Sequence, residues 1–530
     1  MTAAGGLRRA SGQVAVVTAI ARAVGFLRWF AFAWAVGATG VGTVYQSVNA
    51  VPNLVYEIVA GGVLAAVVVP LVAAARRTGR GDEVASSLLT GAIVVLTPVT
   101  VLLLVTAPWI SARLLDGVPI DGAAGLGGRL LALFSPQVLL YGVGVVVAGT
   151  LQAHERLLAA AVAPLLSSLV VIATYVAYAL IVPAARRDVA GIPDAGWWVL
   201  GAGTTLGVVA LSLPLLVVAA RAGIRLRPSW SLTRDDLGWA GRLAGAGLVG
   251  LLAQQLALLV ILRVANRSGG DGAFVVHQYA QAVYLLPYAV LAVPVATATF
   301  ARLAGREAGS SAPVDAGSAA TLNRALLVVL ALSGAATAAL VAAAPGVGAF
   351  FAAIDRGSSE GGAAAITALP VALATTSLGL MGFSVAALAT RVLFVRGSSL
   401  AVGVGVAAGW LVAALVPVLV LGRAEGPTPT LAVIGGASAA GMTLSAAILL
   451  GALRPAWGAG AVTGLPRLVL VLCSGVALAG GIGWWLHGRE LEGSAAVLVG
   501  GLAGVIAAAL TAGASLLVEP RLRQAVRRAP

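Results

Sequence analysis

Apolar stretches long enough to cross a bilayer follow one another along almost the whole chain. A helix needs about 20 mostly apolar residues to span the hydrocarbon of a membrane. Of the 530 residues, 60% are hydrophobic and only 10% are charged, whereas soluble domains carry about 25% charged residues. The composition therefore excludes a soluble fold and predicts an all-α polytopic membrane protein.

The apolar stretches divide into about fourteen transmembrane helices, separated by short connectors that hold most of the charges. The second stretch is longer than one crossing needs, and we expect it to bend at Pro52. The expected spans are residues 13–36, 42–75, 83–110, 126–152, 158–182, 195–220, 238–265, 273–302, 319–344, 361–391, 399–421, 430–453, 466–486 and 494–517.

The distribution of arginine predicts the orientation in the membrane. All 33 basic residues are Arg; 22 of them lie in connectors on the side of the N-terminus and nine on the opposite side. The positive-inside rule places both termini in the cytoplasm, which requires an even number of spans. The net charge of +14 and the pI of 11.2 thus indicate topology signals and contact with membrane lipids, and no nucleic-acid partner is expected.

The longest cytoplasmic connector follows the sixth span and divides the chain. We expect an N-lobe of six helices over residues 1–222, a C-lobe of six over residues 223–455, and a helix pair with a basic tail over residues 456–530. Tyr45 to Pro52 and Tyr279 to Pro287 are similar Tyr/Gln stretches that each lead to a proline, one in each lobe. Matched interrupted helices indicate an alternating-access transporter; coincidence is the alternative, because proline is common in membrane helices.

Charged side chains inside the first two spans are the first candidates for a binding site. Arg22 and Arg28 lie six residues apart, which is about 9 Å of rise and roughly 120° of rotation on a helix. A charge at this depth is costly and is usually paired or turned to a protein-lined cavity. A guanidinium fork suits phosphate oxygens. The alternatives are an internal ion pair between Arg22 and Glu57, and extension of Arg28 to the interface.

Polar residues near Pro52 extend this candidate site. Gln46 and Asn49 can satisfy the backbone freed by the proline, or contact a polar ligand. Pro52 itself is either a hinge or a static kink. Glu57 is a substrate-site candidate that would tune the two arginines.

The second lobe has its own polar patch around the eighth span. Tyr279 and Gln281 are the substrate-contact candidates there, with hydrogen bonding between helices as the alternative. Pro287 is the corresponding hinge candidate.

The sequence gives little support for a disulfide framework, a metal or cofactor site, or an enzyme active site. One cysteine, Cys473, excludes a disulfide framework. The three histidines lie far apart in sequence, so no metal and no cofactor are expected. A membrane glycosyltransferase with a polyprenyl-linked donor has similar hydropathy, but the first external loop, GATGVG, has no acidic residue for catalysis. The chain is therefore not expected to be an enzyme.

With these residues in view, the chain resembles the MurJ/MviN family of lipid II flippases, in the MOP exporter superfamily with the MATE transporters. Specific motifs lie in the first five spans, and the general likeness extends over the whole chain, including the fourteen spans. The motifs are Arg22-x-x-Gly25-Phe26-x-Arg28, Val51-Pro52-Asn53-Leu54, Val69-Pro70 and LLALFSPQVLLYGVGVVVAGTLQAHERLLAAAVAPLL. Gly25, in the first motif, is a further hinge candidate.

The resemblance implies two six-helix lobes around a cationic cavity, and a groove for the polyprenyl tail formed by the last two helices. It also implies alternating access that carries a disaccharide-pentapeptide pyrophosphate lipid between leaflets of the plasma membrane. Thr43, Tyr56 and Ala282 stand where the family has charged cavity residues, and Gly61-Gly62 replaces a Glu-Gly pair. Another polyprenyl-linked glycan is therefore an alternative substrate.

The predicted function is a flippase for a polyprenyl-pyrophosphate-linked saccharide, with the peptidoglycan precursor lipid II as first candidate. Arg22 and Arg28 would attract the pyrophosphate. A MATE-like exporter of amphipathic small molecules is the alternative within transport, and it would favour an acidic cavity. A non-transporting membrane scaffold that binds cell-wall synthesis proteins is the alternative outside it.

Overall fold

The computed structural model describes residues 3–59, 65–183, 188–307, 314–355, 363–489 and 493–527. Helices connected by short turns make up these residues, and no strand occurs among them. The predicted all-α class is thereby confirmed.

Twelve helices in the described residues are long and apolar enough to cross a membrane, and a bent pair brings the number to thirteen. The pair is residues 364–377 with 380–395, bent by 44° at the break. These thirteen correspond to all the predicted spans except residues 42–75. In that range the chain forms α2 (Val41–Tyr56) and α3 (Ala65–Arg76), and residues 60–64 lie outside the described residues.

Contacts within the chain define two compact units, Met1–Leu251 with Asp355–Ser359, and Leu252–Ile354 with Glu360–Pro530. The predicted boundaries at residues 222 and 455 stay predictions.

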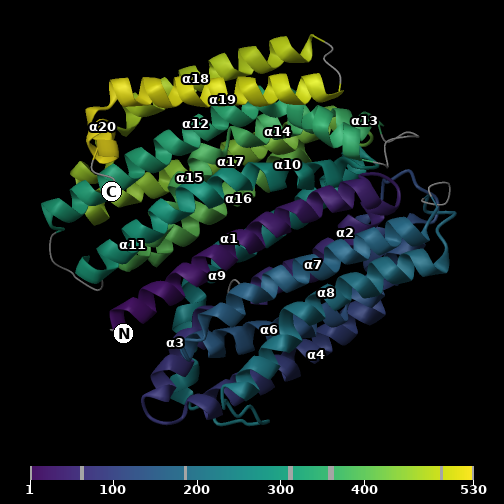
Figure 1. The fold of residues 1–530 in the computed structure, drawn as a ribbon, viewed down its shortest axis with the longest axis vertical. Coiled ribbons are helices and arrows are strands. Elements are labelled where there is room, and N and C mark those ends of the chain that lie inside the picture. The colour runs from purple at the N-terminus through teal and green to yellow at the C-terminus, as the bar shows by residue number, and fades with distance from the viewer. Residues whose placement is uncertain are drawn as a thin grey trace. The chain divides into compact units, whose positions relative to one another are not determined.

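In the first unit, α1 packs along α7, α7 along α8, and α6 against α4 and α8 (Figure 1). The shorter α2 contacts α5 and α6, and α3 packs on α6. Buried aliphatic side chains of α6, α7 and α8 form one of its cores. The remaining helices of this unit are α1 (Ala3–Ala35), α4 (Gly81–Leu114), α5 (Ala123–Phe134), α6 (Pro136–Ala153), α7 (Leu157–Ile181) and α8 (Asp194–Arg221).

The helix α9 (Arg234–Val264), which contains the boundary between the units, begins with a reciprocal cap. The backbone N–H of Thr233 donates to Asp236 (3.0 Å), and the N–H of Asp236 donates to the Thr233 hydroxyl (3.1 Å). This is the capping-box arrangement, which satisfies two donors at a helix start. The hydrogen bond from the Thr233 backbone lowers the pKa of Asp236.

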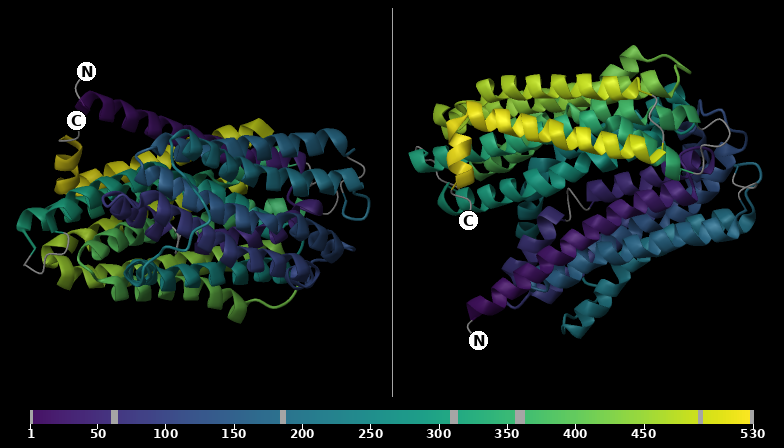
Figure 2. Two further views of the ribbon diagram at one scale, coloured as in Figure 1. Left: turned by 90° about the horizontal axis from the view of Figure 1, so that it is seen from below. Right: turned by 45° about the horizontal axis from the view of Figure 1, so that its top comes forward.

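The second unit is built around α12, the longest helix of the described chain, which packs on α14, α15, α18 and α19. The last two long helices, α18 and α19, lie side by side, and α20 turns away from the end of α19 (Figures 1 and 2). The helices of this unit are α10 (Ala273–Pro287), α11 (Val293–Glu307), α12 (Ala316–Ile354), α13 (Ala363–Thr367), α14 (Leu369–Ser377), α15 (Leu380–Val395), α16 (Ser399–Val420), α17 (Pro427–Trp457), α18 (Leu465–His487), α19 (Gly493–Val518) and α20 (Pro520–Arg527).

Glycine allows several of these helices to approach closely. A Cβ added at Gly409 of α16 would lie 2.6 Å from the carbonyl oxygen of Gly441 in α17. A Cβ added at Gly500 of α19 would lie 2.7 Å from the Cα of Gly346 in α12. Membrane helices lack a strong hydrophobic drive to associate, so such small residues let dispersion contacts hold them together.

We predict that Gly441→Ala destabilises the protein, because the added methyl group would overlap the backbone of Gly409. Overpacking of this kind costs about 1–3 kcal/mol, so thermal unfolding of the purified protein in detergent should occur at a lower temperature. Gly436→Ala, on the same helix, is the matched control, because an added Cβ there meets no atom within 4 Å. An equal effect of both substitutions would contradict the close-packing account.

Candidate functional site

The first helix carries both predicted arginines, and they differ in environment. The side chain of Arg22 is exposed and that of Arg28 is half-buried. Gly25, between them, lies where α1 meets α7, since an added Cβ would stand 3.8 Å from the Ser168 hydroxyl oxygen. The chain thus holds Arg28 closer to the interior of the first unit than Arg22.

Three tyrosines from neighbouring helices lie within electrostatic range of Arg28: Tyr45 of α2, Tyr141 of α6 and Tyr175 of α7. All three are buried. A guanidinium inside a span is stabilised by nearby hydroxyl dipoles and by any anion that reaches it. Arg28 and these hydroxyls form the polar centre of the first unit.

Tyr45 connects α2 to two other helices. Its hydroxyl is 2.7 Å from the Thr204 hydroxyl of α8 and 3.1 Å from the Tyr175 hydroxyl. Its ring packs against Phe32 and against Phe134, with centroids 5.7 and 5.6 Å apart. Because the Tyr45 side chain is fully buried, these contacts fix the first half of α2.

Asn53 fixes the second half of α2. Its side-chain nitrogen donates to the carbonyl of Asn49 (2.8 Å), and its side-chain oxygen accepts from the Tyr141 hydroxyl (3.0 Å). The ring of Tyr56 packs against that of Tyr141 at a tilt of 40°, with centroids 4.3 Å apart. The amide of Asn53 therefore uses both of its ends, one within α2 and one toward α6.

The helix α2 continues through Pro52 as regular α-helix as far as Tyr56, and residues 57–59 form a wider, π-helical turn. The interruption expected at Pro52 thus lies a turn further along. Pro52 and Gln46 are buried, and Asn49 is half-buried. The hinge and ligand roles of these residues stay predictions.

Glu57 occupies the C-cap of α2, with an exposed side chain. The predicted ion pair between Glu57 and Arg22 stays a prediction. Glu57 is accessible where it could adjust the local charge near a ligand.

In the second unit, Tyr279 is fully buried and its ring stacks on that of Phe351, with centroids 4.7 Å apart. Gln281 is half-buried. Pro287 is the last residue of α10, and a π-helical turn over Tyr288–Ala292 follows before α11. Pro287 therefore marks an interruption of this span, and the substrate roles of Tyr279 and Gln281 stay predictions.

Each unit contains a pocket of its own. A cavity of about 260 Å³ in the first unit is lined by Tyr56, Tyr141 and Gln152, with glycine and aliphatic side chains of α6, α7 and α8. A groove of about 690 Å³ in the second unit is lined almost entirely by apolar side chains of α12, α14, α15, α17 and α18. Cys473, which is exposed, belongs to that groove.

No cluster of three or more His, Cys, Asp or Glu side chains suited to a metal ion occurs in the described ranges of the chain. The polar centre can hold an anion through Arg28 and hydroxyl donors. Its partners Tyr141, Tyr175 and Thr204 were not predicted from the sequence. They lie between 88 and 159 residues from their bonding partners in α2, and only the packing of the helices brings them together.

The sequence matches the family model described as lipid II flippase MurJ over residues 32–502. The chain belongs to this family. Membership in the MurJ family confirms the resemblance noted from the motifs. It also confirms the predicted class of function, a flippase of the plasma membrane that serves peptidoglycan synthesis.

Solved structures confirm the MurJ-type fold. A lipid II flippase MurJ in an inward closed conformation has a TM-score of 0.72 at 16% identity, over 97% of this chain and 99% of that chain. An inward-facing MATE multidrug-resistance transporter of the MOP superfamily has a TM-score of 0.61 at 18% identity, over 84% and 96%. A MOP superfamily transporter from Pyrococcus furiosus also gives 0.61, at 17% identity, over 85% and 96%.

We predict that Tyr45→Phe destabilises the MurJ-type first unit by about 1–2 kcal/mol, the usual cost of lost buried hydrogen bonds. The change removes the hydroxyl that joins Thr204 and Tyr175. Tyr175→Phe is the comparison, because it keeps the shorter bond to Thr204 and should cost less. Thermal unfolding in detergent measures both; a larger effect of Tyr175→Phe would contradict the central place of Tyr45.

Proposed function

We propose that this MurJ family member carries lipid II, or a closely related polyprenyl-pyrophosphate-linked saccharide, across the membrane without chemical change. Arg28, with Arg22, would bind the pyrophosphate. The observation that carries this proposal is the half-buried position of Arg28 in a membrane span, within electrostatic range of three buried tyrosine hydroxyls.

The pyrophosphate fits this position on physical grounds. An Arg guanidinium remains charged at all physiological pH values and presents paired N–H donors that match phosphate oxygens. Low-dielectric walls around a cation concentrate anions. The position of Arg22 one to two turns away on α1, with its side chain exposed, supports a role in first contact with the headgroup, and the accessible carboxylate of Glu57 would limit how tightly the anion is held.

The polyprenyl tail requires a long apolar surface that remains in contact with lipid. The groove of about 690 Å³ in the second unit has this character, and α18, the first helix of the C-terminal pair, supplies one side of it. This supports the tail position implied by the family resemblance. A tail held in an apolar, lipid-facing groove would stay in contact with the bilayer while the headgroup crosses.

The transport cycle is proposed to be alternating access. The π-helical turns after Pro52 and at Pro287 support it, because such turns often mark functional sites in helices. The arginine asymmetry supports cytoplasmic termini. In that orientation the membrane potential would act on a charged headgroup with about 2.3 kcal/mol per charge per 100 mV.

We predict that Arg28→Ala abolishes complementation of a flippase-deficient strain, because the pyrophosphate loses its charge-assisted hydrogen bonds. Arg28→Lys, which keeps the charge but not the fork, should retain part of the activity. Flipping is measured as the accessibility of lipid II in the outer leaflet, with membrane abundance determined in parallel.

Arg77→Ala is the control for this experiment, because Arg77 is an exposed connector residue after α3. Arg22→Ala should also lose function without a fall in membrane abundance. Full activity of Arg28→Ala would refute the assigned role, and unchanged lipid II accessibility in cells depleted of the protein would refute the proposed function.

The single cysteine allows a test of the tail groove. Labelling Cys473 with a bulky, membrane-permeant thiol reagent should fill the groove and inhibit flipping, and prior binding of a polyprenyl-linked substrate should slow the labelling. Cys473→Ala protein, treated in the same way, should keep its activity. Unimpaired flipping by fully labelled protein would contradict the proposal that the polyprenyl tail occupies this groove.

A further inference from the structure

A large pocket lies at one end of the second unit, apart from the candidate transport site. Its volume is about 1170 Å³, and its lining comes from the start of α12, the ends of α15 and α17, the turn before α18, and α20. Because α12 begins there while α17 ends there and α20 follows the end of α19, these segments meet at a single face of the membrane. The arginine asymmetry predicts that this face is cytoplasmic.

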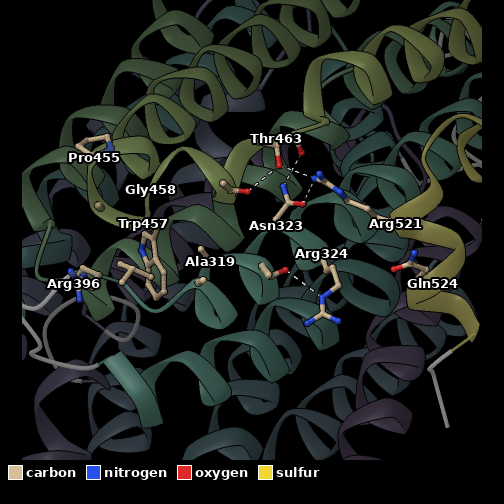
Figure 3. A pocket seen from close by; sticks show the side chains of 15 residues that line it. Ala319, Asn323, Arg324, Arg396, Pro455, Trp457, Gly458, Thr463, Arg521 and Gln524 are labelled. Atoms are coloured by element: carbon tan, nitrogen blue, oxygen red, sulfur yellow. Dashed lines mark hydrogen bonds between the residues drawn. The ribbon is translucent and has the colours of Figure 1, made fainter.

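The lining of this pocket is basic. Arg324, Arg396 and Arg521 contribute to it, and no carboxylate does so among the described residues. Arg396 is already compensated, because its guanidinium nitrogen lies 3.3 Å from the carboxylate of the buried Glu307. In Figure 3, Arg396 lies beside Trp457 at one end of the pocket, while Arg324 and Arg521 lie toward the other end. Among the described lining residues, the two other arginines, Arg324 and Arg521, therefore lie toward α20.

Arg521 is held in position by neutral partners. One guanidinium nitrogen donates to the side-chain oxygen of Asn323 (3.1 Å) and to the Thr463 hydroxyl (2.7 Å) (Figure 3). Asn323 is buried, and its side-chain nitrogen donates to the carbonyls of Ala461 and Thr463. The side chain of Arg521 is thus oriented by a polar framework that does not neutralise it.

Two further donors complete this end of the pocket. Gln524 lies three residues after Arg521, so both side chains project from the same face of α20, and both belong to the lining. The exposed Arg324 side chain donates to the carbonyl of Ala320 on its own helix. The nearest acid in sequence, Glu519, accepts from the backbone N–H of Arg521.

We infer that this pocket binds a phosphate group, between Arg324 and Arg521 with Gln524 as an additional donor, and that the phosphate belongs to an anionic phospholipid of the cytoplasmic leaflet. Guanidinium groups favour phosphate oxygens. Basic pockets between membrane helices at the cytoplasmic surface suit anionic headgroups. The alanine, proline and tryptophan side chains on the remaining walls suit the glycerol and first methylene groups of a lipid better than they suit a free ion.

The test measures binding of a fluorescent short-chain phosphatidylglycerol to the full-length protein in a neutral detergent. Wild-type protein should bind it and should bind the matching phosphatidylcholine much more weakly. Arg324→Gln and Arg521→Gln should each weaken phosphatidylglycerol binding by about tenfold, the effect of one charge-assisted hydrogen bond. Arg467→Gln is the matched control, because Arg467 is an exposed residue in the first turn of α18 and does not line the pocket.

Arg324→Gln keeps the test decisive if Arg521→Gln weakens the fold, because the hydrogen bond of Arg324 to Ala320 runs within its own helix. Wild-type affinity in folded Arg324→Gln protein, or equal losses in Arg324→Gln and Arg467→Gln, would overturn the site. Inorganic phosphate serves as the second probe and should compete only at much higher concentration than the lipid. Equal competition by inorganic phosphate would contradict the inference that the bound phosphate belongs to a lipid.

Discussion

The structure of the first unit depends on satisfying polar groups inside a membrane. An arginine and three tyrosines would each be costly in hydrocarbon without partners. In α2, the Tyr45 hydroxyl avoids this cost because it bonds to both Thr204 and Tyr175. The Asn53 amide avoids it because both of its ends are hydrogen-bonded. Tyr45, Tyr141 and Tyr175 also lie within electrostatic range of Arg28. The hydroxyl groups that stabilise the first unit are therefore the same ones that the proposed anion site would use.

Close packing of small residues complements these polar contacts. Where glycine faces glycine, as at Gly409 and Gly441, the backbones approach so closely that few other residues fit. The apolar groove of the second unit, which includes Cys473, lies among helices packed in this manner. The closely packed apolar groove suits contact with a lipid tail. The accessible basic pocket at the end of the same unit suits contact with a headgroup phosphate.

Most of the fold could be predicted from the sequence, because apolar length is a local property. Thirteen predicted spans reappear among the helices and the bent pair, whereas the range 42–75 appears as α2 and α3. The arginines of α1 were predictable because a charge inside an apolar stretch is visible in the sequence alone. The tyrosine neighbours of Arg28 were not, since Tyr141 and Tyr175 resemble ordinary interfacial residues until the helices are packed. The basic pocket beside α20 was not predictable for the same reason, since its residues come from helix ends that lie far apart in the sequence.

The turn over Tyr288–Ala292 has a geometric consequence for the span that contains it. A π turn holds one residue more than an α turn, and one residue corresponds to about 100° around a helix axis. The stripe of α10 that carries Tyr279 is therefore out of phase with any stripe continued onto α11. Within the one span Ala273–Glu307, the helix can therefore pack an aromatic face against one neighbouring helix before the turn. After the turn it can pack an unrelated face against another neighbouring helix.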